Sequence, residues 1–198
     1  CIRDRQRSSK KGTKLTQLYA RLAEVLIILD TEFDLANLKR AQQLLATIVE
    51  DQVINYSITL FALLKLCEVL FQQYIMSGEE ALLKDLEHRL SHLQGLAQQA
   101  NFSIVVISAL LMQGKLKIMQ MNYSQAKLFF QQALKLSKEK ELDKQIKHSE
   151  NELVELAQAE KTCVLRNAMR EEEAQPSREK HYKEFFAYLD LAKHSLQL

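Results

Sequence analysis

Two histidines spaced four residues apart, His88 and His92 in the stretch LEHRLSHLQG, form the pair in this sequence that is closest to a metal site. On a helix such residues lie on one side, where two imidazoles can share a Zn²⁺ ion. A zinc site needs further ligands, and no third ligand is evident in the sequence. Both histidines also fall opposite a stripe of leucines at 82, 86 and 90. We therefore expect a solvated helix face here, without a metal ion.

The other reactive side chains form no catalytic set. Cys67 or Cys163 would need a paired histidine and a lowered pKa to act as a nucleophile, and the sequence shows neither. Cys67 lies in the apolar stretch LFALLKLCEVLF, which predicts a small buried side chain. The acidic run 171–173 is expected to be a solvated helix end. Glycine-rich phosphate loops and the motifs HExxH, CxxC and GxSxG do not occur, so we expect no enzyme activity, no catalytic residue and no cofactor.

The composition predicts an all-α protein. Of the 198 residues, 47% are hydrophobic and 26% are charged, as in ordinary globular proteins, but only four are glycine and one is proline. All-β and Rossmann-type folds need more of these turn-forming residues. The abundant residues are the strong helix formers Leu, Ala, Lys, Glu and Gln. Lys65 and Glu68 interrupt the longest apolar stretch, so no membrane span is expected.

Cysteine usage and charge bear on location and partners. Three scattered cysteines do not make a disulfide framework, which favours a reducing compartment and a cytoplasmic location. Residues 1–14 hold six Arg or Lys residues against Asp4 alone, although the net charge of the chain is only +2. We expect this segment to be a flexible basic tail or linker. A nucleic-acid or anionic-lipid arm is the alternative, and binding of nucleic acid is not expected elsewhere in the chain.

The spacing of apolar residues is helical from residue 15 to residue 140. Segments 56–76 and 102–121 are apolar around nearly their whole circumference. The segments with a single apolar stripe are 15–31, 36–50, 79–100 and 123–138. This alternation is typical of stacked hairpins, in which one helix of each pair is sandwiched and the other covers an outer face. We therefore predict a helical-hairpin solenoid of about three hairpins over residues 15–140.

A short phrase occurs twice in the chain. The letters NYSI at 55–58 recur as NFSI at 101–104, 46 residues later. Each phrase opens a strongly apolar segment after an asparagine, Asn55 or Asn101, which we expect to cap the helix. The shift sets Ile58 against Ile104 and predicts that the two side chains occupy equivalent environments in two related units.

Residues 107–140 form the clearest repeat unit. Gly114 lies in mid-helix, where glycine costs about 1 kcal/mol relative to alanine, and this predicts a close approach of the second helix. Tyr123 lies at the turn, and Ala126, Phe130 and Ala133 follow at spacings of four and three. In these positions the unit resembles the tetratricopeptide repeat (TPR) family. The separation of 46 residues is similar to that of longer-repeat, TPR-like arrays in signalling and transcription-regulatory proteins.

The resemblance implies a non-enzymatic protein–protein interaction or scaffold module, a segment of a larger regulatory protein. Such a module binds a peptide or helix on a concave surface lined by the first helices of the hairpins. The family's groove positions, carried over from Gly114, are Ala62, Lys65, Val69, Gln72 and Gln73 in one unit and Ser108, Leu111, Lys115, Ile118 and Met119 in the next. The lysines would suit an acidic peptide.

The last part of the chain, residues 141–198, has a different character. Residues 141–173 are rich in Glu, Lys and Gln with a thinner apolar stripe, which predicts one long helix. Pro176 breaks the chain, and 178–197 is expected to form a final amphipathic capping helix. This extension supports an alternative function, a self-associating structural scaffold that forms homodimers through 141–198.

Overall fold

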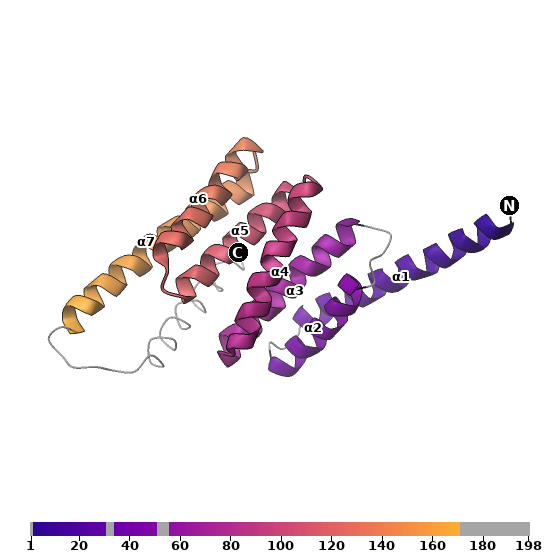
Figure 1. Cartoon of the computed structure of the whole chain (residues 1–198), viewed down its shortest axis with the longest axis horizontal. Helices are drawn as coiled ribbons and strands as arrows, with labels where there is room; N and C mark the ends of the chain where they lie inside the picture. Colours follow the sequence, from indigo (N-terminus) through magenta and orange to yellow (C-terminus); the bar gives the residue numbers. More distant parts are fainter. Residues whose placement is uncertain (1, 31–33, 51–55, 171–198) are drawn as a thin grey trace. The chain divides into compact units, whose positions relative to one another are not determined.

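The structure is a computed structural model that describes the backbone of residues 2–30, 34–50 and 56–170, and within these ranges the side chains from residue 15 to residue 162. This part is built from helices and contains no strand, which confirms the all-α helical-hairpin prediction (Figure 1). The helices are α1 (Ile2–Asp30), α2 (Leu35–Glu50), α3 (Tyr56–Ser77), α4 (Glu80–Gln99), α5 (Ser103–Met119), α6 (Tyr123–Glu139) and α7 (Asp143–Arg170).

The start of the chain differs from the expectation. The basic segment, expected to be a flexible tail, is helical from Ile2 onward and continuous with α1. Arginine, lysine and glutamine are good helix formers and make up half of this segment, which favours the extension although Gly12 works against it. The long helix expected after residue 141 is α7, whereas the capping helix expected at 178–197 lies outside the described residues. Contacts divide the chain into two compact units, Cys1–Val154 and Glu155–Leu198, at a boundary within α7.

Within the first unit, each helix from α1 to α5 packs against the next one in the sequence, and α3 also contacts α5. Among the described residues, α3 is the one helix that is long and apolar enough to cross a membrane, judged by length and composition. Most of that stretch is buried in the first unit, where α3 contacts α2, α4 and α5. The prediction that 56–76 and 102–121 are sandwiched helices is confirmed, since buried side chains of α3 and α5 point in several directions around each helix.

The pair α5–α6 depends on the close approach that Gly114 allows. A Cβ atom built on Gly114 would overlap the Phe130 ring, and even the far ring atom Cζ would be only 2.8 Å away. Phe130 is fully buried, as are Ala126 and Ala133 on the same face of α6. The glycine and the ring therefore interlock at the density of a protein core. The predicted close helix crossing at Gly114 is confirmed.

Three consecutive helices end in the same kind of turn. Asn101, Met121 and Glu141 lie 20 residues apart and have positive φ angles of 58°, 59° and 53°. After α5, for example, the N–H of Met121 donates to the carbonyl of Ile118, and the next N–H donates to the carbonyl of Lys117. This is the Schellman arrangement, which satisfies carbonyls that the helix end would leave without partners. The same pattern closes α4 and α6.

The prediction drawn from the NYSI phrase is wrong in two respects. Ile58 is 7% exposed whereas Ile104 is 51% exposed, so their environments differ. Asn101 does not cap α5 but ends α4, because its left-handed φ closes the preceding turn. Helix α5 begins after Phe102, which makes no side-chain capping bond. Asn55, the other expected cap, lies outside the described residues.

A repeat-like arrangement of hairpins is present, but its spacing differs from the expected 46 residues. Helices α3 and α5 begin at Tyr56 and Ser103, 47 residues apart. When the sequence is aligned with itself at a shift of 47 residues, Cys67 is equivalent to Gly114, and both are small residues buried within their helices. The following hairpin is shorter, because α5 and α6 have 17 residues each whereas α3 and α4 have 22 and 20. The units are therefore related in packing but unequal in length.

Replacing Gly114 with alanine should destabilise the fold, even though alanine favours the helix by about 1 kcal/mol. The new methyl group would press on the buried Phe130 ring, and overpacking of this kind costs about 1–3 kcal/mol. Gly95→Ala in α4 is the matched control, since a Cβ there meets nothing within 4 Å and should increase stability. Urea unfolding followed by circular dichroism measures both changes. Equal effects of the two substitutions would contradict the packing described here.

The left-handed turns predict a second stability difference. Met121→Gly and Glu141→Gly should each raise the free energy of unfolding by roughly 0.5–1 kcal/mol, because glycine adopts a positive φ without steric cost. Asn101→Gly should change less, since asparagine tolerates this conformation. Gln120→Gly, one residue before the turn at a φ of −82°, should instead lower stability. A loss of stability in Met121→Gly equal to that in Gln120→Gly would show that no strain is relieved.

Candidate functional site

A groove with a volume of about 330 Å³ opens between α2, the end of α3 and the start of α4. Helix α3 contacts both α2 and α4, so its last turns form the floor between two walls. A tight turn at Gly78, with a φ of 69°, ends α3 and brings the start of α4 to the groove. The lining residues are Leu35, Lys39, Gln42, Gln43, Ala46, Gln73, Ser77, Glu79 and Leu82.

The floor of the groove carries a pair of carboxamides. Gln73 is 2% exposed, and its Nε2 donates a hydrogen bond of 2.9 Å to Oε1 of Gln42. Burying an amide without a partner costs free energy, so each glutamine helps to keep the other in place. Among the described residues these two side chains make no other hydrogen bond. The remaining amide donor of Gln42 and the carbonyl of Gln73 are therefore still available to a ligand.

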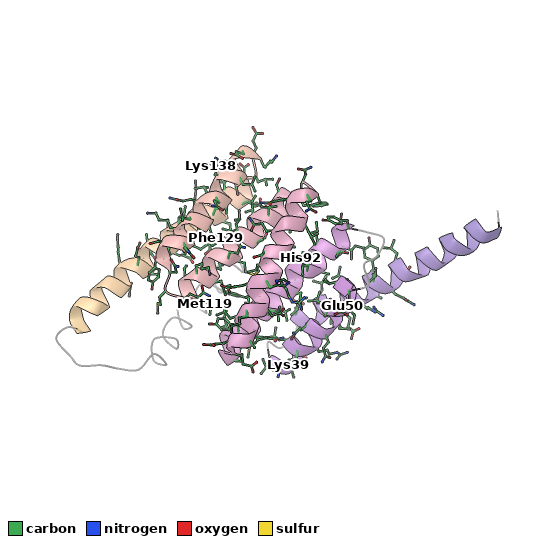
Figure 2. All side chains as sticks on the ribbon, viewed as in Figure 1. Lys39, Glu50, His92, Met119, Phe129 and Lys138 are labelled. Carbon is green, nitrogen blue, oxygen red and sulfur yellow. The ribbon has the colours of Figure 1, made fainter. Side chains whose placement is uncertain are left out.

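The walls are amphipathic. Leu35, Ala46 and Leu82 supply apolar surface, while Lys39 and Glu79 supply one positive and one negative charge. Figure 2 labels Lys39 on α2. Both charged side chains are exposed and have no ion-pair partner among the described residues. The groove thus offers apolar contact, amide hydrogen bonding and two charges within a short distance of one another.

The structure places the residues predicted to line a concave surface in several environments. The buried residues of this set expose little surface to a partner, and they are Ala62, Val69, Leu111, Ile118 and Met119. Gln73 is buried as well, but it lines the groove described above. Lys65, Gln72, Ser108 and Lys115 are partly exposed on α3 and α5. The groove positions carried over from the TPR family by their distance from Gly114 are thus mainly core residues here, because other helices cover α3 and α5 on several sides.

Both lysines expected to attract an acidic partner are already paired. Lys65 lies 2.7 Å from a carboxylate oxygen of Glu68 and 5.7 Å from the centre of the Phe61 ring. Lys115 lies 2.7 Å from Glu152 of α7. An incoming anion would compete with these carboxylates, and the competition is stronger at Lys115, because its partner Glu152 is buried.

Glu152 is the most unusual carboxylate in the described part of the chain. It is 6% exposed, and its Oε1 accepts bonds from Lys115 at 2.7 Å and from His148 at 3.0 Å. Burial alone would raise the pKa of Glu152, but the bonds from His148 and Lys115 outweigh it, so the pKa lies below its usual value. The sequence signal for this cluster is the i, i+4 spacing of His148 and Glu152, which was missed.

The described side chains form no cluster suited to a metal ion, and Cys67 is buried. No group of three or more His, Cys, Asp or Glu residues could hold a metal ion there, and His88 and His92 gather no third ligand. Burial raises the pKa of the Cys67 thiol to about 12, so the nucleophilic thiolate is scarce at neutral pH. Cys163 and the acidic run 171–173 lie outside the described side chains.

Comparison with known proteins adds no relative. No family model, no curated protein and no solved structure matches the chain. The assignment of a site therefore depends on the geometry of the groove and on the chemistry of its lining.

Replacing Glu152 with glutamine should lower the free energy of unfolding at pH 7 by about 1–3 kcal/mol, because Lys115 would lose its buried partner. The lowered pKa means that the ionised form stabilises the fold above the ordinary glutamate pKa of about 4.3, and that this contribution is lost as the pH falls below it. Urea unfolding at pH 7 and at about pH 3 measures the change.

Glu150→Gln is the matched control for this substitution. Glu150 lies on the same helix, is 49% exposed and pairs with Lys138 at 3.3 Å, so its loss should cost at most about 1 kcal/mol. A difference between wild type and Glu152→Gln that stayed the same at both pH values would refute the role given to the ionised carboxylate.

Proposed function

We propose that this chain is a non-enzymatic protein-binding module of helical repeats, and that it holds an extended peptide segment in the groove between α2, α3 and α4. The hairpin architecture and the interlocked pair of Gly114 and Phe130 support kinship with TPR-like arrays. Such arrays act by the shape and polarity of a surface. The unreactive Cys67 thiol supports a role without chemistry of its own. A cytoplasmic location remains a prediction.

The Gln42–Gln73 pair carries this proposal. A carboxamide presents a donor and an acceptor in one plane, and so does the main chain of an extended peptide. With one bond joining the two glutamines, the donor left on Gln42 and the acceptor left on Gln73 can meet a peptide carbonyl and a peptide N–H. Because the pair is held in place before binding, little side-chain entropy is lost when the ligand arrives.

The charges of the groove indicate which peptides fit. Lys39 is the cation among the lining residues and lacks an ion-pair partner in the described part of the chain. An acidic side chain of the ligand beside Lys39 would gain an ion pair without displacing another carboxylate. This supports an acidic peptide, as the sequence suggested, but at a lysine of α2 in place of Lys65 and Lys115.

The proposal is tested with peptides selected from a random library displayed on phage and then measured by fluorescence anisotropy. The double variant Gln42→Met, Gln73→Met removes the amide pair while keeping side-chain length, and replacing both partners by apolar groups should be nearly neutral for folding. We expect it to bind the selected peptides at least tenfold more weakly than the wild type. Lys39→Glu should disfavour acidic peptides.

Gln72→Met provides the control, since Gln72 is adjacent on α3 and does not line the groove. It should bind the selected peptides as the wild type does. If the wild type selects no peptide, or if the double variant binds as tightly as Gln72→Met, the groove is not a peptide site.

A further inference from the structure

Helix α1 carries apolar side chains on two opposite faces. On the inner face Leu18, Val25 and Ile28 are 3%, 0% and 8% exposed. On the outer face Leu26 and Ile27 are 44% and 65% exposed, and Tyr19 is 52% exposed. A helix that is apolar on one face needs one covering element, whereas a helix apolar on opposite faces needs two.

The outer residues form one continuous stripe. At 100° per residue, Tyr19, Ala23 and Leu26 fall within about a sixth of the helix circumference, and Ile27 lies next to them. Val25 of the inner face lies on the other side of the helix. The inner face packs against α2, and the exposure of the stripe shows that no described element covers the outer one. We call Tyr19, Ala23, Leu26 and Ile27 the outer stripe.

The outer stripe is complementary to itself in an antiparallel arrangement. If Ala23 of one chain faces Ala23 of a second copy, Tyr19 faces Ile27 of the second copy, and Leu26 faces the small Ala20. Large side chains then meet medium or small ones, and the alanine on the twofold axis lets the two helices approach closely. A symmetric contact of this kind buries the same surface on both copies.

Charge supports the same arrangement. The antiparallel alignment directs the basic first half of α1, which contains Lys10, Lys11 and Lys14 in its sequence, toward the end of α1 of the second copy. That end carries the exposed Asp30. A parallel alignment would instead place like charges together, which disfavours it.

We propose that the outer stripe of α1 is a docking surface for a second copy of this chain, which binds antiparallel about a twofold axis at Ala23. This interface differs from the homodimer expected through 141–198, and it does not depend on the peptide groove. Because the stripe spans only a few helical turns, the association is weak, with a dissociation constant on the order of 10–100 µM.

Sedimentation equilibrium of the full chain over a concentration series tests the interface. The apparent mass of the wild type should rise from 22.9 kDa toward twice that value. Ala23→Glu and Ala23→Lys each place like charges against each other on the axis, so each variant alone should dissociate at least tenfold more readily. An equimolar mixture of the two should associate again, because the charges on the axis are then opposite.

Leu128→Glu is the control, since Leu128 is 57% exposed on α6 and should leave the association unchanged. Circular dichroism checks that every variant keeps its helix content. A wild type that stays monomeric throughout the series overturns the proposal. So does association that survives both Ala23 variants, which would place the contact elsewhere, for example in 141–198.

Discussion

Helices α3 and α5 are apolar around most of their circumference, so they are stable in water only when other helices cover them on several sides. Most of the first unit follows from this constraint. Helices α2 and α4 lie against α3, helices α4 and α6 lie against α5, and α3 and α5 contact each other. The covering helices need only one apolar stripe each, and their remaining faces are left for charged and amide side chains, including those of the groove.

The same constraint explains why most of the residues expected to line a concave surface are buried. The first helices were predicted to line an open concave face, but packing covers most of their surface, and a residue such as Val69 or Met119 exposes little surface to a partner. The groove opens instead where two covering helices, α2 and α4, leave the end of α3 between them. Its polar lining comes from residues that the core does not require.

How much could be predicted from the sequence depends on the range of the interactions involved. The predictions of the helical segments and of a close helix crossing at Gly114 were correct, because both follow from residue spacing within one or two adjacent helices. The phase of the repeat was not, since the NYSI phrase is a local resemblance and the burial of Ile58 and Ile104 is set by neighbours distant in the chain. The Gln42–Gln73 pair joins residues 31 positions apart, and the Lys115–Glu152 pair joins α5 to α7. Contacts between residues so far apart in the sequence cannot be predicted from a local sequence pattern.

The turns at Asn101, Met121 and Glu141 have a consequence for how a chain of this type can grow. The backbone adopts nearly the same conformation at each of these residues. A segment of two helices, such as the one from Asn101 to Glu141, therefore begins and ends in equivalent geometry. Whole hairpins can then be gained or lost by duplication or deletion of about 40 residues without a new junction having to evolve. The α3–α4 and α5–α6 hairpins differ in length, so equivalent turns do not require hairpins of equal length.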